Sequence, residues 1–173
     1  VRRITSFSVD HDFIVPGIYV SRIDGDVTTY DLRTRRPNAD DFMDNRTMHS
    51  LEHMFATYVR SSKIGERVIY FGPMGCQTGF YLLVRDAENS EVLSVVIDVL
   101  KKIIAHEGEI FGKVRRECGN YKNLDFKGFV LESCGDDRAL KPCADFLSEK
   151  GIGITVFSKI SSSSFAHVSN TRL

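Results

Sequence analysis

The spacing of apolar residues changes along this chain from an alternating period to a helical one and back, which limits the folds that are open to it. In DVTTYDLRTR (26–35), Thr28, Tyr30 and Leu32 alternate with the residues between them, as in a β-strand. A DGD turn separates this stretch from GIYVSRI (17–23) and indicates a hairpin. Further strand signals occur at RITSFSV (3–9), ERVIYFG (66–72) and GFYLLVR (79–85).

Two segments follow a helical period instead. Residues 47–62 carry apolar side chains at steps of three and four, and Gly65 ends the segment; the repeating residues are Met48, Leu51, Phe55, Tyr58 and Val59. Ser90 is expected to cap a second helix that ends near His106 and buries a stripe of Leu93, Val96, Ile97, Leu100, Ile103 and Ile104. Hairpin strands mixed with helices predict an α+β domain rather than a parallel α/β fold.

Beyond Cys118, the spacing of apolar residues gives weaker signals for helices and strands. The stretch 136–151 is consistent with a helix that begins or breaks at Pro142, and 152–158 with a short strand. The polar stretch 160–173 is expected to be a loose tail.

The composition argues against a nucleic-acid-binding, membrane or secreted protein. Lys+Arg and Asp+Glu number 23 each, a balance that does not point to nucleic acid or an anionic membrane as a partner. We find no apolar run long enough to span a bilayer, and the start VRRITSFSVDH lacks the apolar segment of a secretory signal, so a cytoplasmic location is expected. The four cysteines, Cys76, Cys118, Cys134 and Cys143, have no CxxC spacing, and a reduced thiol is buried, catalytic or metal-bound.

The motif HSLEH (49–53) carries two histidines four residues apart on the first expected helix. At about 100° per residue, His49 and His53 lie about 40° apart around the helix axis, so both imidazoles can reach one point. They lie more than about 100° from the apolar stripe centred on Leu51 and Phe55, so they are not where core residues belong. Two readings follow: a polar surface of an ordinary helix, or the H-x-x-E-H pattern of inverted zinc hydrolases.

A catalytic metal usually takes three protein ligands and keeps one position open, so a third ligand is needed. Neighbouring acidic residues, the other histidines and a cysteine are all candidates. Cys118 in ECGNY is attractive, because the glycine that follows frees the backbone to turn; the alternative is a small buried apolar side chain. A thiolate ligand would favour zinc or ferrous iron over magnesium or calcium.

Cys76 lies in FGPMGCQTGFYL, between glycines at 75 and 79 and at the junction of two expected strands. Gly75 leaves access to the thiol, and polar residues follow it where aliphatic ones would surround a packed cysteine. An incidental cysteine in a structural turn is the alternative. A nearby cation would favour the reactive thiolate.

These segments together resemble the S-ribosylhomocysteine lyase family, which makes the precursor of the quorum-sensing signal autoinducer-2. The resemblance is carried by SFSVDH (6–11), YDLRTRRPN (30–38), HSLEH (49–53), PMGCQTGFYL (73–82) and ECGNY (117–121), in the family's order and near its spacing. It covers residues 4 to 123 or so, and five ordered motifs are far more specific than H-x-x-E-H alone.

The resemblance implies a role for each matched residue. The implied metal ligands are His49, His53 and Cys118, which would hold ferrous iron, one per subunit, with zinc as a substitute. The implied acid/base pair is Glu52 and Cys76, and the implied substrate contacts are Ser6, His11 and Arg33. The implied fold is a single α+β domain, an antiparallel sheet packed against helices in a two-layer sandwich, which forms a homodimer with interfacial active sites. Residues 1–123 would be the catalytic core, 124–160 a divergent part of the same domain, and 161–173 a flexible tail.

The implied reaction explains these residue types. A Lewis-acid metal and an acid/base pair would move the carbonyl of S-ribosylhomocysteine along its ribose, and β-elimination would then release homocysteine and 4,5-dihydroxy-2,3-pentanedione. The chain departs from the family where Tyr70, Phe71 and Gly72 replace residues that commonly include an aspartate and a serine. Two rival functions are an H-x-x-E-H zinc metallopeptidase, which would leave Cys76 idle, and a metal-stabilised binding protein with no enzymatic role.

Overall fold

The computed structural model describes residues 9–40, 42–125 and 155–156. Its strands and long helices are, in chain order, β1 (Gly17–Asp24), β2 (Val27–Arg33), α1 (Asn45–Arg60), β3 (Val68–Pro73), β4 (Gly79–Arg85), α2 (Asn89–Ile104) and β5 (Thr155–Val156). Short 3-10 helices lie at η2 (His11–Phe13), η3 (Gly65–Arg67) and η4 (Tyr121–Asn123). Within the described residues, no helix combines the length and the apolar character needed to cross a bilayer.

The strands form one sheet in the order β3-β4-β2-β1-β5. The first four strands pair antiparallel, and β5 pairs parallel with β1. The expected α+β domain with an antiparallel sheet is therefore confirmed, as is a short strand within 152–158. The strand expected at 3–9, the helix at 136–151 and the tail at 160–173 lie outside the described residues, apart from Val9.

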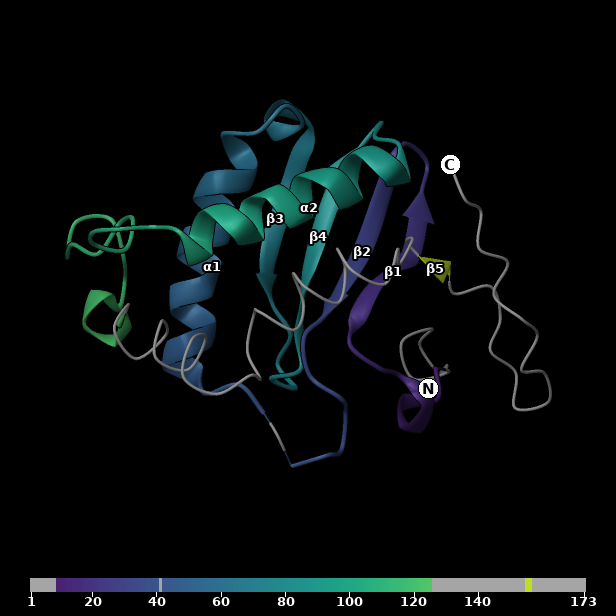
Figure 1. Ribbon diagram of the computed structural model, residues 1–173, viewed down its shortest axis with the longest axis horizontal. Coiled ribbons are helices and arrows are strands. Elements are labelled where there is room, and N and C mark those ends of the chain that lie inside the picture. Colours follow the sequence, from purple (N-terminus) through teal and green to yellow (C-terminus); the bar gives the residue numbers. More distant parts are fainter. Residues whose placement is uncertain (1–8, 41, 126–154, 157–173) are drawn as a thin grey trace.

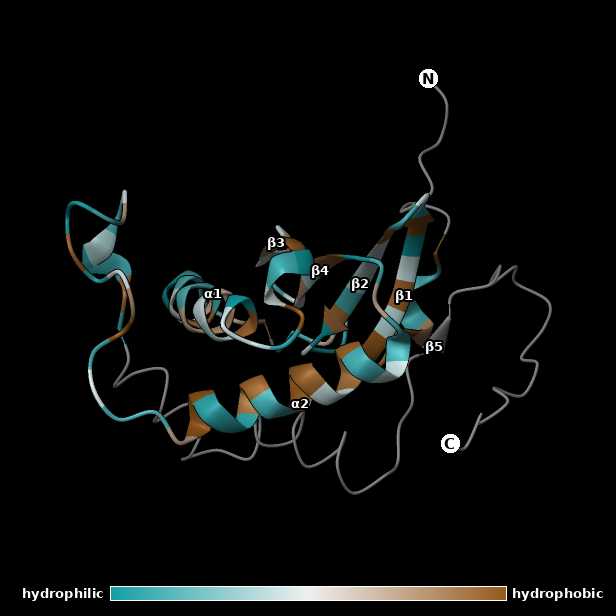
Figure 2. Ribbon diagram, turned by 90° about the horizontal axis from the view of Figure 1, so that it is seen from above, coloured by the Kyte–Doolittle hydropathy of each residue, from teal (hydrophilic) through white to brown (hydrophobic). Residues whose placement is uncertain are grey.

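The core lies between the sheet and the two long helices. Figure 1 shows α1 running beside β3, and Figure 2, from above, shows α2 lying across one face of the sheet. Phe71 on β3 stacks between Phe55 on α1, at a centroid distance of 4.2 Å, and Phe80 on β4, at 5.2 Å. Alternate residues of the strands supply this face, because successive side chains of a strand point to opposite sides.

Helix α1 confirms the helix predicted at 47–62, with both ends shifted two residues toward the N-terminus. Asp44 is its N-cap, and the carboxylate accepts hydrogen bonds from the backbone N–H groups of Arg46 and Thr47. All five residues of the expected apolar side are buried or partly buried in the core. This packing leaves the histidine side of α1 for the segment that follows α2.

Helix α2 lies where expected, but its start and its buried side differ from the prediction. Its N-cap is Glu88 rather than Ser90, with no side-chain capping bond, and its buried residues are Val92, Val95, Val96, Val99, Leu100 and Ile103. Leu93 and Ile97 are only partly buried, and Ile104 is 39% exposed. Apolar residues occupy two neighbouring sides of this helix, so helical spacing alone cannot choose between them.

Candidate metal centre and active site

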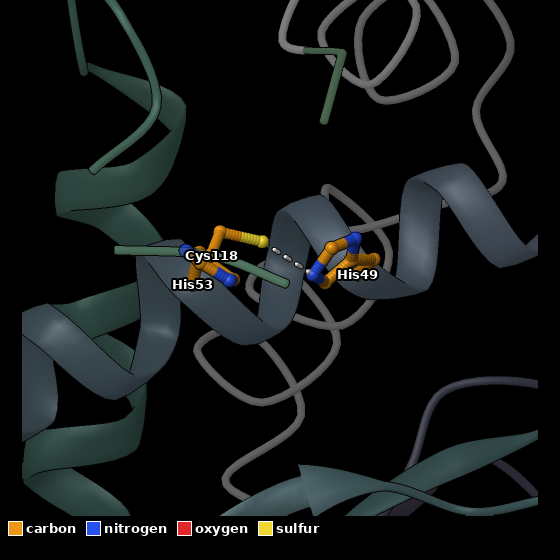
Figure 3. A group of neighbouring side chains, drawn as sticks. All are labelled: His49, His53 and Cys118. Carbon is orange, nitrogen blue, oxygen red and sulfur yellow. Dashed lines mark hydrogen bonds between the residues drawn. The ribbon is translucent and has the colours of Figure 1, made fainter. Parts of the chain in front are cut away.

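Helix α1 places His49 and His53 one turn apart, and Cys118 approaches both from the segment after α2 (Figure 3). One donor atom from each side chain lies within 4.8 Å of the other two, and Cys118 Sγ is 3.5 Å from His49 Nε2. Ligand atoms of a tetrahedral ion, with bonds of about 2.0–2.3 Å, stand roughly 3.3–3.8 Å apart. The three side chains therefore fit one divalent ion with small inward movements.

The tautomer of His53 is set by a backbone carbonyl. His53 Nδ1 is 2.8 Å from the oxygen of Phe111, which can only accept, so Nδ1 carries the hydrogen. The lone pair of Nε2 is then available for a metal. A second hydrogen bond of this kind is typical of metal-binding histidines and orients the ring.

The Cys118 side chain is buried, and its sulfur accepts a backbone hydrogen bond. It is 8% exposed, and the backbone N–H of Asn120 donates to Sγ at 3.4 Å. The chain turns at Gly119, as expected, but the turn does not require glycine, because its φ is not left-handed and an added Cβ would meet nothing within 4 Å. Two imidazoles and a thiolate are borderline-soft donors, a set suited to zinc or ferrous iron.

The segment that carries Phe111 and Cys118 is held against α1 by a hydrogen bond and by ring contacts. Tyr58 on α1 lies 2.7 Å from His106 Nδ1, and His106 Nε2 donates to the carbonyl of Glu109 at 3.2 Å. With Nε2 as donor, Nδ1 accepts the hydrogen of the Tyr58 hydroxyl. The Phe111 ring packs edge-on against the rings of Tyr58 and His106. This cluster holds the Phe111 carbonyl, which orients His53, in place.

Gly112 is expected to be intolerant of a side chain. Its φ is +70°, and an added Cβ would stand 3.1 Å from His53 Nδ1. Gly112→Ala should therefore cost about 1 kcal/mol of stability and weaken metal binding roughly 10- to 100-fold, because the outer-shell bond to His53 is disturbed. Competition with a chromophoric chelator measures this affinity. The control is Gly75→Ala, where an added Cβ meets nothing within 4 Å; equal affinities in the two variants would contradict the prediction.

Burial shifts the pKa values of two residues of the motif. Burial, and to a lesser degree the charge on His53, lower the pKa of His49, which keeps its imidazole neutral and able to bind a metal. Burial raises the pKa of Glu52, and His53 opposes that rise. A raised pKa makes the Glu52 carboxylate a stronger base than an exposed glutamate.

The Cys76 loop joins β3 to β4, and its thiol is exposed. Gln77 adopts a left-handed φ of 62°, and its carbonyl accepts a hydrogen bond from Met43 N–H at 3.1 Å. Because Met43 directly precedes the Asp44 cap of α1, this loop and the histidine end of α1 lie at the same end of the domain (Figure 1).

Arg33 contacts this loop, is 3% exposed, and has most of its donors in hydrogen bonds. Its Nε and Nη2 bond the Asp31 carboxylate at 3.1 and 2.5 Å, and Nη1 bonds Thr78 Oγ1 at 2.6 Å. Nη1 also lies 3.9 Å from Cys76 Sγ. Burial would lower the pKa of Arg33, but Asp31 and Cys76 outweigh it, so the pKa is raised and the guanidinium stays charged.

His11 belongs to the same neighbourhood. Burial raises the pKa of Asp31, while the charges of Arg33 and His11 oppose that rise, which places His11 within electrostatic reach of the pair. Ser6 lies outside the described residues. Sequence reasoning missed Asp31 and Thr78; the alternation that put Asp31 and Arg33 on one side of β2 was the available signal.

Tyr70 and Gly72 form a matched pair on edge strand β3. An ideal Cβ on Gly72 would collide with the Tyr70 hydroxyl, so the tyrosine ring occupies the space that a side chain at residue 72 would need. Tyr70 itself is 47% exposed.

The sequence of this chain is similar to those of known proteins of one family. The family S-ribosylhomocysteinase (LuxS) matches residues 4–130. An S-ribosylhomocysteine lyase of Finegoldia magna is 42% identical over 130 residues, 72% of this chain and 83% of the relative. One of Clostridium acetobutylicum is 40% identical over 157 residues, 82% of this chain and 99% of the relative. With this similarity over most of its length, the chain belongs to the S-ribosylhomocysteinase family.

Proposed function

We propose that this protein is a carbon-sulfur lyase that cleaves S-ribosylhomocysteine into homocysteine and 4,5-dihydroxy-2,3-pentanedione, the autoinducer-2 precursor. The family match supports this reading over a zinc metallopeptidase or a binding protein. The single structural observation that carries it is the convergence of His49, His53 and Cys118. These three residues come from motifs 69 positions apart in sequence, as the His49–Cys118 contact shows.

We infer that these three side chains hold one divalent metal per subunit, ferrous iron with zinc as a substitute. The donor set supports this choice, because thiolate and imidazole suit these ions and three ligands leave a position open. When bound, the metal would act as a Lewis acid that polarises a carbonyl of the sugar.

Glu52 and Cys76 are the proposed proton carriers. Cleaving the thioether requires a carbon acid beside the carbon that bears sulfur, so the sugar carbonyl must first migrate along the chain. At each step a base takes a proton from carbon and an acid returns one to the neighbouring carbon. Removal of the last carbon proton expels homocysteine thiolate. The raised pKa of Glu52, caused by burial, and the exposed Cys76 thiol beside charged Arg33 suit these roles.

Substrate contact is proposed for Ser6, His11 and Arg33. The bonds from Arg33 to Asp31 and Thr78 occupy most of its donors, so we propose that it acts on substrate chiefly through its positive charge and its approach to Cys76. The role of Ser6 stays a prediction.

The function is tested with purified protein loaded anaerobically with ferrous iron. It is expected to release free thiol from S-ribosylhomocysteine, measured with a thiol reagent. The metal-free protein is the control. Absence of thiol release above this control, with one metal shown bound per chain, would contradict the proposed function.

We also propose a homodimer with interfacial active sites, in the cytoplasm. The dimer is what the resemblance of the sequence motifs to the family implies. Light scattering on the metal-loaded protein is expected to give twice the chain mass, and an active monomer would count against it.

A further inference from the structure

A hydroxyl group lies between the Cys76 thiol and the buried Asp31–Arg33 pair. Thr78, which is 2% exposed and directly precedes β4, places Oγ1 2.9 Å from Cys76 Sγ and 2.6 Å from Arg33 Nη1. We propose that Thr78 is a positioning residue, whose hydroxyl donates its hydrogen to Cys76 and holds the sulfur as a thiolate aimed out of the loop. This inference rests on the proposed acid/base role of Cys76.

The direction of the hydrogen bonds follows from the guanidinium. Arginine has donors and no acceptor, so Nη1 must donate to Thr78 Oγ1. The hydrogen of the threonine hydroxyl is then left for another acceptor, and Cys76 Sγ is the one in contact among the described residues. A thiolate accepts this hydrogen well, whereas a thiol is a weak acceptor with a hydrogen of its own to place. The arrangement therefore satisfies the charged form of Cys76 best.

The charge of Arg33 reaches the sulfur along the same path. Asp31 holds two nitrogens of the guanidinium, which leaves Nη1 to face Thr78 and Cys76. A hydroxyl that accepts from a cation is polarised and donates more strongly to the next group. Thr78 thus relays an electrostatic effect that the 3.9 Å separation of Nη1 and Sγ would otherwise weaken.

The backbone around Thr78 fixes this geometry. The carbonyl of Thr78 accepts from the N–H groups of Thr34 and Arg35, each at 3.0 Å. A Cβ on the next residue, Gly79, would lie 2.5 Å from the Leu32 carbonyl oxygen, so glycine permits the close approach of β4 to β2. These backbone contacts do not use the hydroxyl, and they survive its removal.

Thr78→Val removes the hydroxyl and keeps the shape of the side chain. The reactivity of Cys76 is measured without substrate, from the rate of alkylation by iodoacetamide followed on the Cys76 peptide by mass spectrometry. The rate is measured over a range of pH values, because charged and titratable groups near Cys76 also affect its reactivity. Arg33 and Tyr81 act electrostatically on Cys76, and Asp31 pairs with Arg33. Alkylation is expected to slow on the order of tenfold near neutral pH and to recover at higher pH, because a charge-assisted hydrogen bond is lost.

Thr78→Ser keeps the hydroxyl and is expected to restore the alkylation rate. The matched control is Thr29→Val, the same change on β2 at a residue in register with Arg22 and Leu83. If Thr78→Val does not fold, as judged by circular dichroism, Thr78→Ala replaces it. In lyase assays the Thr78 variant should lose kcat with little change in KM.

Wild-type alkylation rates at every pH in folded Thr78→Val or Thr78→Ala would overturn the proposal, as would a serine variant as slow as the valine one. Alkylation needs no substrate, so the two proposals can fail separately. If Thr78→Val slows Cys76 alkylation but the wild type has no lyase activity, only the proposed function is contradicted.

Discussion

Replacing Cys76 with alanine is expected to lower kcat for S-ribosylhomocysteine cleavage by roughly a hundred- to ten-thousandfold, the range that a general acid/base group supplies. The thiol is exposed at the rim of the β3–β4 loop and is not one of the three converging metal ligands, so bound metal should stay at one ion per chain. Turnover is measured by release of homocysteine thiol, and metal content by atomic absorption.

Two comparisons make this result specific. Circular dichroism of Cys76→Ala should match the wild type, because the backbone bonds of the loop run through Met74, Gln77 and Gly79 rather than the thiol. Gly75→Ala, one residue earlier and with no atom near its added Cβ, is the matched loop variant and should keep far more activity. Turnover of Cys76→Ala within tenfold of the wild type would remove Cys76 from the mechanism.

Replacing Cys118 with alanine is expected to have the opposite pattern, with loss of metal as the primary effect. Cys118 is one of three ligands, so its removal should weaken binding by more than the roughly 10- to 100-fold that an outer-shell partner contributes. Turnover should fall because the ion is lost. Cobalt-loaded protein provides a direct readout, since a thiolate ligand produces a sulfur-to-metal charge-transfer band that this variant should lack.

Cys76→Ala is the matched control for this experiment, because it removes the other described cysteine and should keep the charge-transfer band. If Cys118→Ala keeps the band and Cys76→Ala loses it, Cys76 rather than Cys118 binds the metal. A Cys118→Ala protein that unfolds entirely without metal would favour a structural site of the closed four-ligand kind over the proposed catalytic one.

Local periodicity predicted the secondary structure near the site well, and its errors have physical causes. The start of α1 was placed two residues late, because the Asp44 cap was not recognised as the start signal. The buried side of α2 was misjudged because Leu93 and Ile97 compete with Val95 and Val99 for the core at equal helical spacing. Which side is buried depends on the sheet and on α1, and a single helix does not contain that information.

The sequence by itself determined the candidate metal ligands. His49 and His53 share a helix side, and the family resemblance of the five ordered motifs added Cys118 where residue reasoning alone left the third ligand open. Only the tertiary structure decided which groups surround the candidate site residues: the Phe111 carbonyl bonds His53, and Asp31 and Thr78 bond Arg33 beside Cys76. The Phe111 carbonyl is a backbone group that any residue type carries, and the Arg33–Thr78 contact joins residues 45 positions apart. Such contacts exist only once β2, β4 and α1 are packed, because strand register and helix orientation bring their atoms together.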